Sequence, residues 1–438
     1  MVRPERRTDD ATANEGADMH MHRLHHSRKL RAALSTAAIA AALVVIVGCA
    51  EPGPASSGTT ASAQGSFDEA VNTAIDDVFT PTRPQSKLPG VLARLESKLQ
   101  DKLVPTVKRV VVADAVLEAG SGNQTIATQL IDARIAERVA ARFPDVELLP
   151  FQSANVARAQ YVLTGTMGRI GQVSGQGGYR IDLSLSDIKT RSIAAHVTSR
   201  ARPQGIDTTP SPYYRDSPVL LRDNVVEQIE ATSRATAGEP TPPGYLDRVP
   251  AATLLADATT AYNADRLEQA LGMYQQALAA PGGEQLRVYN GIYLTNWRLG
   301  RVSEAEQAFG RVVASGLANR NLGVKFLFKA NSTDFWPDPK VSAPYEFWLR
   351  QIARQAVSSR ACLQVVGHTS RTGTVEYNDQ LSQRRALYIK QRLETEAAEL
   401  APRTRASGMG YRENLVGTGT DDIRDAIDRR VEFKVDAC

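Results

Sequence analysis

Apolar residues along the stretch 67–199 follow two alternating spacings. A spacing of three to four residues over 67–79, 91–103 and 125–142 predicts helices. Short apolar runs predict strands at 109–112, 146–149, 161–166, 179–187 and 193–199, with a short helix at 154–159. Helices that alternate with strands are typical of an α/β layer fold. The sequence therefore predicts an α/β domain over 67–235, which includes a short amphipathic segment at 219–229.

A Pro-rich linker at 236–250 leads into a helical stretch, 251–320, with an internal repeat. One group of small and aromatic residues returns about 35 positions later. The two groups are Ala270, Tyr274 and Ala277, and then Ala305, Phe309 and Val312. This pattern resembles two tetratricopeptide-type helical hairpins, which are too few to stand alone, so we expect them to pack against a neighbouring domain. The alternative is an ordinary helical spacer that binds nothing.

The last part of the chain, 322–438, predicts a βαβαβ-type unit. Its expected strands lie at 324–328, 363–366, 405–409 and 430–435, and its expected helices at 344–356 and 385–397. The second helix has an apolar face that repeats every three to four residues. The whole chain is thus predicted to be a multidomain protein of the α/β and α+β classes.

A local irregularity points to chemistry at the start of the second of these helices. Ser382 is a natural N-cap, which would place Arg384 and Arg385 in the first helical turn. Cations there oppose the helix dipole, but free backbone N–H groups and a guanidinium together suit a carboxylate ligand. The alternative is that Arg385 only pairs with a nearby acid, Glu376 or Asp379.

Composition and charge exclude several classes of protein. The chain has 438 residues, 42% of them apolar, which is enough for about three packed domains, and its net charge of +4 gives no indication of nucleic acid as a partner. Four of the six histidines lie before residue 30, so we expect no metal site and no histidine-based catalysis. His368 is expected to hydrogen-bond its own turn. The Gly-rich segment 118–125 lacks the lysine of a phosphate loop and is predicted to be an ordinary turn. We therefore predict no catalytic residues, no enzyme and no cofactor.

The N-terminus has the three parts of a secretory signal. A basic stretch, 23–31, precedes an apolar run of mostly small residues, 32–47, that ends at Cys49. The run is shorter than the ~20 residues that a membrane-spanning helix needs. Small residues before a Cys in this position resemble the lipobox of bacterial lipoproteins. The resemblance implies that the signal peptide 1–48 is removed, that Cys49 is acylated, for example with palmitate, and that Ala50 directs the protein to the outer membrane.

The remaining cysteines then have an expected role. The segment 49–66 is rich in Pro, Gly, Ser and Thr and predicts a flexible tether. With Cys49 lipidated and the chain facing the periplasm, Cys362 and Cys438 are free to pair under oxidising conditions. We predict this disulfide, which would fasten the last residue of the chain to the strand at 363–366.

Two adjoining sequences in the N-terminal domain, VELLPFQSANVARAQYVLTGTMGRIG and YRIDLSLSDIKTRSIAA, resemble the periplasmic domain of FlgO-like and CsgG-like lipoproteins. In that family a Y-V-L-x-G-T strand follows a helix, and a D-x-x-T turn links the next two strands. The resemblance implies a scaffolding module of envelope assemblies. Tyr213 and Tyr214 in the Pro-rich loop 207–218 are expected to pack onto the domain surface, with docking of a partner as the alternative.

The sequences GHTSRTGTVEYNDQLSQRRA, GMGYRENLVGTGT and DRRVEFKV near the C-terminus resemble the peptidoglycan-binding domain of the OmpA family. In that family the Asp of a G-H-T-D turn holds the ammonium of the diaminopimelate side chain, and the Arg of L-S-x-x-R-A holds its carboxylate. The resemblance assigns the arginine role to Arg385. Asn378 and Leu381 match pocket positions of the family and are expected to shape the floor of the site.

The charged pair of the family is incomplete in this chain. The position of the family Asp is Ser370, and a hydroxyl holds an ammonium more weakly than a carboxylate does. The family Asn before R-R-V is Asp428 here, so we expect Asp428 to return a carboxylate to the pocket beside Arg429. The opposing hypothesis is that Ser370 marks a domain that has lost or changed its ligand.

These observations lead to one expected function and one alternative. The first is an outer-membrane lipoprotein, lipid-anchored and facing the periplasm, that binds peptidoglycan through the diaminopimelate stem peptide and links or positions an envelope assembly. The helical hairpins would contact envelope protein partners. The alternative is an assembly or activator subunit of a secretion, appendage or cell-wall synthesis machine, with an OmpA-like domain that no longer binds the usual ligand.

Overall fold

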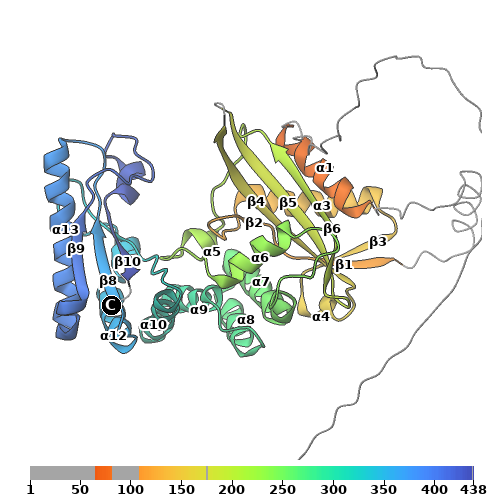
Figure 1. The fold of residues 1–438 in the computed structure, drawn as a ribbon. Helices are drawn as coiled ribbons and strands as arrows, with labels where there is room; N and C mark the ends of the chain where they lie inside the picture. Colours follow the sequence, from red (N-terminus) through yellow and green to blue (C-terminus); the bar gives the residue numbers. More distant parts are fainter. Residues whose placement is uncertain (1–64, 81–107, 174–175, 437) are drawn as a thin grey trace, which may run out of the picture. The chain divides into compact units, whose positions relative to one another are not determined.

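The computed structural model describes residues 65–80, 108–173, 176–436 and 438 (Figure 1). The predicted signal peptide, Cys49 and the helix expected at 91–103 lie outside these residues, as does the tether before Gly65. The described part contains helices and two sheets, so the prediction of mixed helix and sheet is confirmed. Within it, no helix has both the length and the apolar character that crossing a membrane requires.

The first sheet contains the five strands that the N-terminal pattern predicts and one short strand, β2, that it did not predict (Figure 1). They are β1 (Arg109–Ala113), β2 (Leu117–Glu118), β3 (Val146–Pro150), β4 (Tyr161–Val173), β5 (Gln176–Asp187) and β6 (Ser192–Ala201). The order is β3-β1-β4-β5-β6, and β2 pairs with β4. β1 is parallel to both neighbours, whereas β4, β5 and β6 are antiparallel. β4 continues past the expected end at Thr166 because it stays paired with β5.

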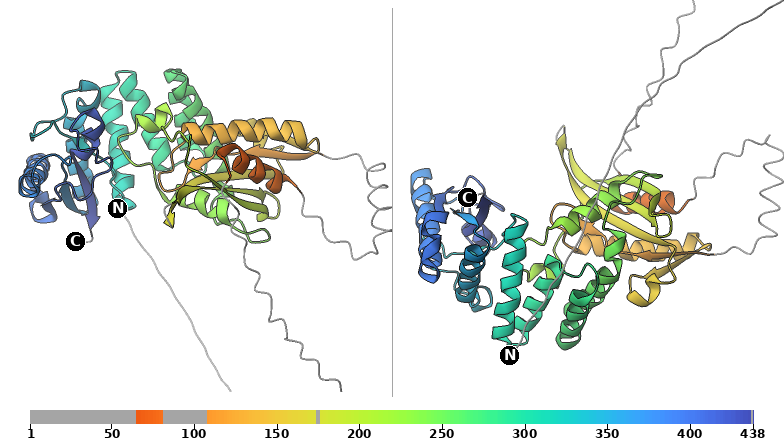
Figure 2. Two further views of the ribbon diagram at one scale, coloured as in Figure 1. Left: turned by 90° about the horizontal axis from the view of Figure 1, so that it is seen from above. Right: turned by 60° about the horizontal axis from the view of Figure 1, so that its bottom comes forward.

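Helices cover both faces of this sheet (Figure 2). They are α1 (Phe67–Phe79), α3 (Ile126–Arg142), α4 (Ser153–Val156), α6 (Asn224–Arg234) and α7 (Val249–Asn263). Adjacent residues of a strand point to opposite faces. Accordingly Val111 packs in a core with Ile131 of α3, and Val112 packs in a second core with Ile229 of α6. The predicted α/β layering is therefore present, although nothing in the fold tests the FlgO-like assignment.

The Pro-rich loop after β6 contributes to the core more than the sequence suggested. It contains the short helix α5 (Pro212–Arg215), whose Tyr213 is completely buried. The ring of Tyr213 lies edge-on to Tyr262 at 5.9 Å and stacks on Tyr274 at 6.0 Å between ring centres. The expected packing on the surface fits only the half-buried Tyr214, because the ring of Tyr213 fills the space between the loop and the following helices.

Helices occupy the whole repeat region. The 3-10 helix η1 (Leu246–Arg248) leads into α7, which is followed by α8 (Leu267–Ala279), α9 (Leu286–Arg298) and α10 (Val302–Ala318). All six repeat residues are buried. A Cβ atom at Gly291 would lie 2.3 Å from the Tyr274 ring, so α9 and α8 approach closely because a glycine stands there. The tetratricopeptide assignment itself remains a prediction.

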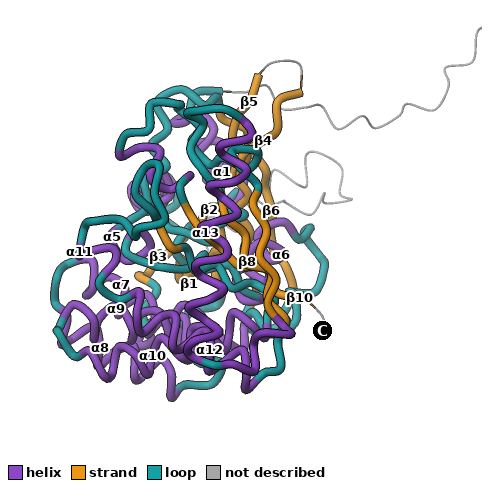
Figure 3. Tube along the Cα trace, turned by 90° about the vertical axis from the view of Figure 1, so that its left-hand side faces the viewer, coloured by secondary structure: helices purple, strands orange, loops and turns teal. Residues whose placement is uncertain are grey.

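The second sheet belongs to the C-terminal part. Its strands are β7 (Phe326–Leu327), β8 (Cys362–Gly367), β9 (Thr404–Gly408) and β10 (Arg430–Asp436), in the order β7-β10-β8-β9. β10 is antiparallel to β7 and β8, and β8 is parallel to β9. The helical elements are α11 (Pro339–Ser342), α12 (Tyr345–Ser358), α13 (Val375–Glu396), η2 (Ala398–Arg403) and η3 (Ile423–Asp428). Apolar residues of α12, α13 and the sheet, including Ile352, Ile389 and Val365, share one core. Figure 3 traces the backbone with helices in purple and strands in orange.

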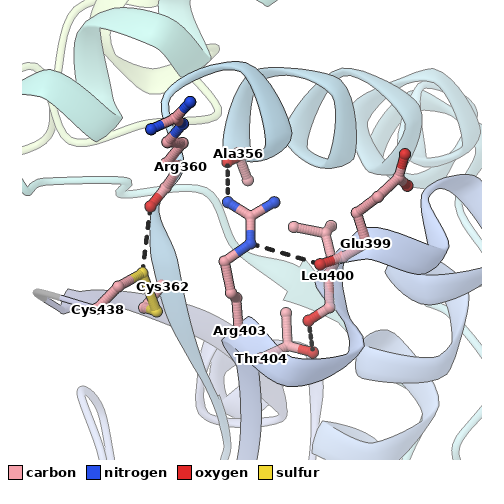
Figure 4. The surroundings of a disulfide bond; sticks show 8 residues. All are labelled: Ala356, Arg360, Cys362, Glu399, Leu400, Arg403, Thr404 and Cys438. Atoms are coloured by element: carbon pink, nitrogen blue, oxygen red, sulfur yellow. Dashed lines mark hydrogen bonds between the residues drawn. A yellow bond between two sulfur atoms is a disulfide. The ribbon is translucent and has the colours of Figure 1, made fainter.

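A disulfide joins Cys362 and Cys438, as the cysteine count predicts (Figure 4). Cys362 opens β8, and its register partner on β10 is Asp436, so the strand pairing brings the end of the chain back to β8. The carbonyl oxygen of Arg360 lies 3.2 Å from Sγ of Cys438. Close by, Arg403 donates to the carbonyl oxygen of Ala356, which ties η2 to α12.

Candidate functional site

Arg385 lies in the interior of α13, and its side chain is completely buried. The guanidinium donates three hydrogen bonds to carbonyl oxygens, from Nε to Ser332 (2.9 Å), from Nη1 to His368 (2.9 Å) and from Nη2 to Lys329 (2.7 Å). The ring centre of Phe328 lies 5.3 Å from the guanidinium carbon. Contacts from the loop after β7 and from the residue that follows β8 therefore fix the orientation of this side chain.

The position of Arg385 corrects the argument from the helix dipole. α13 begins at Val375 with Thr374 as its N-cap, so Ser382 lies two turns inside the helix. The hydroxyl of Ser382 donates to the carbonyl oxygen of Asp379 and accepts a hydrogen bond from the N–H of Gly410. Ser382 therefore holds the loop after β9 against α13. Arg385 consequently gains no free helical N–H groups, and any ligand would meet the guanidinium alone.

The charge of Arg385 has no acidic partner nearby. Among the described residues, no carboxylate oxygen lies within 4.0 Å of it. Asp379 is paired instead with Arg412, at 2.6 and 2.7 Å, and Glu376 is exposed. The alternative in which Arg385 only pairs with one of these acids is therefore wrong. Burial lowers the pKa of Arg385 to about 9, and the nearby Arg429 adds to this effect.

The guanidinium also has unused donors. Arginine carries five N–H groups, and three of them donate to the carbonyl oxygens already described. Two N–H groups therefore have no acceptor among the described residues. A buried cation with two open donors suits a carboxylate, which can accept two parallel hydrogen bonds from one guanidinium. The unpaired guanidinium therefore offers a binding position for the carboxylate group of a ligand.

Asp428 is buried, but its carboxylate does not lie beside Arg429. Its Oδ1 accepts hydrogen bonds from the N–H groups of Leu415 (2.6 Å) and Val416 (3.1 Å), and its Oδ2 accepts one from Gly417 (2.7 Å). These three bonds hold the loop between β9 and η3. The prediction that Asp428 returns a carboxylate to the pocket is therefore wrong, because this carboxylate is committed to backbone amides.

A different acid, Asp421, reaches the position predicted for Asp428. Its Oδ1 accepts a hydrogen bond from the hydroxyl of Ser370 at 2.6 Å and one from Nη1 of Arg429 at 2.6 Å. Arg429 is almost fully buried and also donates to the carbonyl oxygen of Asp422. The sequence analysis missed Asp421 because this loop has no periodic pattern, and Ser370 is 51 residues away along the chain.

The other predicted pocket residues lie on the same end of α13. Asn378 is buried, and its Nδ2 donates to the carbonyl oxygens of Thr372 (2.8 Å) and Thr374 (2.9 Å). Leu381 is buried one turn before Arg385. Asn378 thus fixes the turn that follows β8. The structure brings Ser370, Asn378, Leu381, Arg385 and Arg429 into one region and leaves Asp428 in the supporting loop.

His368 is buried, and neither ring nitrogen has a well-directed hydrogen bond in the described residues. The expected hydrogen bond from this side chain to its turn is therefore not formed. Nε2 lies 3.3 Å from Glu432 and 3.9 Å from Glu413. These three residues form the one group in the described chain whose atoms have the spacing of metal ligands. Arg430 and Lys434 already face these two carboxylates, so the arrangement works as an ion-pair cluster.

Comparison with known families agrees with this geometry. Residues 327–427 match the OmpA family, so the chain contains an OmpA-family domain at its C-terminal end. The match includes Ser370, Asn378, Arg385 and Asp421 and ends just before Asp428. No curated protein matches the chain. The resemblances to FlgO-like and tetratricopeptide proteins therefore have no support from these comparisons.

Solved structures similar to this chain include three bacterial proteins. The peptidoglycan-associated lipoprotein from Burkholderia pseudomallei is 24% identical, with 28% of this chain and 94% of that one covered, and a TM-score of 0.23. The C-terminal domain of Helicobacter pylori MotB is 19% identical, with 26% and 84% covered, and a TM-score of 0.22. The cell wall anchor of the T6SS from Pseudomonas aeruginosa is 27% identical, with 26% and 76% covered, and a TM-score of 0.21.

Proposed function

We propose that the C-terminal domain, residues 322–438, binds peptidoglycan non-covalently through the diaminopimelate stem peptide. The observation that carries the proposal is the buried guanidinium of Arg385, with two open N–H groups and no carboxylate partner in the described chain. Burying an unpaired charge costs free energy, so a fold that retains one has a use for it. The OmpA-family match over 327–427 supports the same ligand, and the resemblance to the L-S-x-x-R-A motif assigns the carboxylate-binding role to Arg385.

Each pocket residue then has a proposed role. Arg385 grips the stem-peptide carboxylate through its two open N–H groups. Ser370 and Arg429 line the neighbouring side of the site, while Asn378 and Leu381 shape its floor. Binding requires no bond to be made or broken. The matched family gives no indication of catalysis, so we propose an anchor and no enzymatic activity.

The rest of the chain fits a tether between membrane and wall. We propose that 1–48 is a signal peptide, that Cys49 carries the lipid in the outer membrane, and that 49–66 lets the remaining domains reach through the periplasm. The α/β domain at 67–235 would be a scaffold, connected by the linker 236–250 to the helical hairpins at 251–320. The hairpins would contact other envelope proteins.

A second function remains in competition because Ser370 replaces the acid that the family uses. In that case the protein is an assembly or activator subunit of an envelope machine, and its OmpA-like domain has changed its ligand. A defined protein that co-purifies after the wall has been digested would favour this alternative. The loss of a single charged group at Ser370 is the observation behind it.

Co-sedimentation of the purified full chain with intact peptidoglycan tests the proposal. Wild type should sediment with diaminopimelate-type sacculi and only weakly with lysine-type sacculi, which lack the second carboxylate on that side chain. Arg385→Ala should abolish sedimentation. Arg384→Ala is the matched control, because Arg384 is the exposed neighbour of Arg385 on α13 and should change little. Wild type that stays in the supernatant would refute peptidoglycan binding.

A further inference from the structure

We propose that Asp421 supplies the carboxylate that binds the ammonium group of the ligand, opposite Arg385, so that the site takes a zwitterionic amino-acid head group. This inference rests on the proposed binding of the diaminopimelate stem peptide. It assigns to a residue of the β9–η3 loop the role that the family gives to the acid of its G-H-T-D turn.

The loop that carries Asp421 is held by two buried aspartates. Asp428 accepts the N–H groups at 415–417, as described above. Asp425 accepts N–H hydrogen bonds from Thr418 (3.0 Å), Thr420 (3.1 Å) and Asp421 (3.0 Å). The backbone of Asp421 has a φ of 59°, in the left-handed region that non-glycine residues rarely adopt. Backbone strain of this kind persists only where surrounding contacts fix it, so these contacts set the direction of the Asp421 side chain.

Hydrogen bonds occupy one of the two oxygens of the Asp421 carboxylate. Its Oδ1 receives the hydrogen bonds from Ser370 and Arg429, whereas its Oδ2 receives none from the described residues. The side chain is 17% exposed, so the group is neither sealed in the core nor free in solvent. One carboxylate oxygen therefore stays available to a ligand. An ammonium that approached it would form a charge-assisted hydrogen bond, which is about twice as strong as a neutral one.

The charges around this oxygen match a zwitterion. Nη1 of Arg385 donates to the carbonyl oxygen of His368, and the Asp421 carboxylate accepts from the hydroxyl of Ser370, so the two opposite charges lie on the same turn, 368–370. No ion pair within 4.0 Å joins them in the described residues. An amino-acid head group carries its carboxylate and its ammonium on one carbon and could contact both.

The serine at 370 is explained by the same arrangement. The Ser370 hydroxyl lies 2.6 Å from Asp421. An aspartate at this position would bring a second carboxylate against the first, and two carboxylates at that distance repel each other strongly. A hydroxyl donates a hydrogen bond and steadies the carboxylate instead. Ser370 and Asp421 together therefore represent a transfer of the acid from the turn to the loop.

Titration calorimetry of the full chain tests this inference with two probes. The first is the stem tripeptide that ends in meso-diaminopimelate. The second is the same peptide without the amino group on the diaminopimelate side chain. Wild type should prefer the first probe roughly tenfold or more. Asp421→Asn should lose this preference and bind both probes alike. Asp422→Asn is the matched control, because its carboxylate is paired with Arg424 on the same loop and its loss removes the same charge.

The outcomes separate the inference from the function on which it rests. If wild type binds the tripeptide and Arg385→Ala does not, while Asp421→Asn keeps the full preference for the amino group, the assignment of Asp421 is wrong and peptidoglycan binding stands. If wild type binds neither probe, both fail. If Asp421→Asn unfolds, the exchange variant Ser370→Asp with Asp421→Ser is measured in its place. This exchange variant should prefer the probe that carries the amino group, as wild type does. Failure of a folded exchange variant to regain it would also overturn the assignment.

Discussion

Replacing Arg385 by methionine should remove binding with little change in stability. The two side chains have similar length, but methionine carries no charge into the core. The depressed pKa of about 9, against an ordinary value of 12.5, corresponds to an electrostatic cost of about 3 to 5 kcal/mol in the folded state. The three carbonyl oxygens would lose a charged donor at about 1.5 kcal/mol each. The two effects nearly cancel, so we expect the free energy of unfolding to change by no more than about 2 kcal/mol.

Urea unfolding of the full chain at pH 7, followed by circular dichroism, measures this difference. Arg384→Met is the control, because this neighbouring arginine is exposed and its replacement should change the free energy of unfolding by no more than about 0.5 kcal/mol. A loss of more than about 2 kcal/mol in Arg385→Met alone would show that the carbonyl contacts outweigh the buried charge. Arg385 would then be a structural residue, and its uncompensated charge would no longer be evidence for a ligand.

Three further predictions concern the rest of the chain. Cys438→Ser opens a loop with a sequence separation of 76 and should lower the free energy of unfolding by up to ~4 kcal/mol, and reductant should then have no further effect on the variant. The hydrogen bonds from Arg138 lower the pKa of Asp76 below its ordinary 3.8, so Asp76→Asn should cost about 1 kcal/mol at pH 7. That stabilisation is complete above pH 4 and disappears as the pH falls through the lowered value, so unfolding curves of the two proteins should converge at acidic pH. Gly291→Ala should destabilise the helical region by about 1–3 kcal/mol because its Cβ would overlap the Tyr274 ring, whereas Gly272→Ala, with open space at its Cβ, should stabilise it by up to ~1 kcal/mol in thermal melts.

Elements with a strong apolar period were predictable from the sequence. The helices α1 and α3 and the strands β1, β3, β5 and β6 lie within a few residues of their expected positions, since half-buried strands and amphipathic helices repeat every two or every three to four residues. The beginning of α13 was missed. Its first two turns, 375–382, contain few apolar residues, and the buried Asn378 and Ser382 contact loops from elsewhere in the chain. Ser382 looks like an N-cap in the sequence because a serine hydroxyl can cap a helix or, as here, accept a hydrogen bond from a distant loop residue.

The site residues divide in the same way. Some are indicated by the local sequence, and others are revealed only by contacts between distant parts of the chain. A motif pointed to Arg385, and its role in binding stays a prediction, but the reason given from the helix N-terminus was wrong because α13 begins at Val375. Asp428 was assigned to the pocket because its charge was visible in the sequence, while its use by three backbone amides was not. Asp421 was overlooked because it meets Ser370 only after β8, α13 and the loop before η3 have folded together.

The hydrogen bonds within the folded site decide between these aspartates. Asp428 and Asp425 are surrounded by backbone N–H groups, so their charges are satisfied within the loop and contribute little to a ligand. Asp421 pairs with Arg429 through Oδ1 and leaves Oδ2 open, while Arg385 keeps two N–H groups without an acceptor among the described residues. A ligand that brings one carboxylate to Arg385 and one ammonium to Asp421 satisfies both groups at once. A simple anion would satisfy only Arg385, so selectivity for the amino group is the property that distinguishes a working wall-binding site from a buried arginine alone.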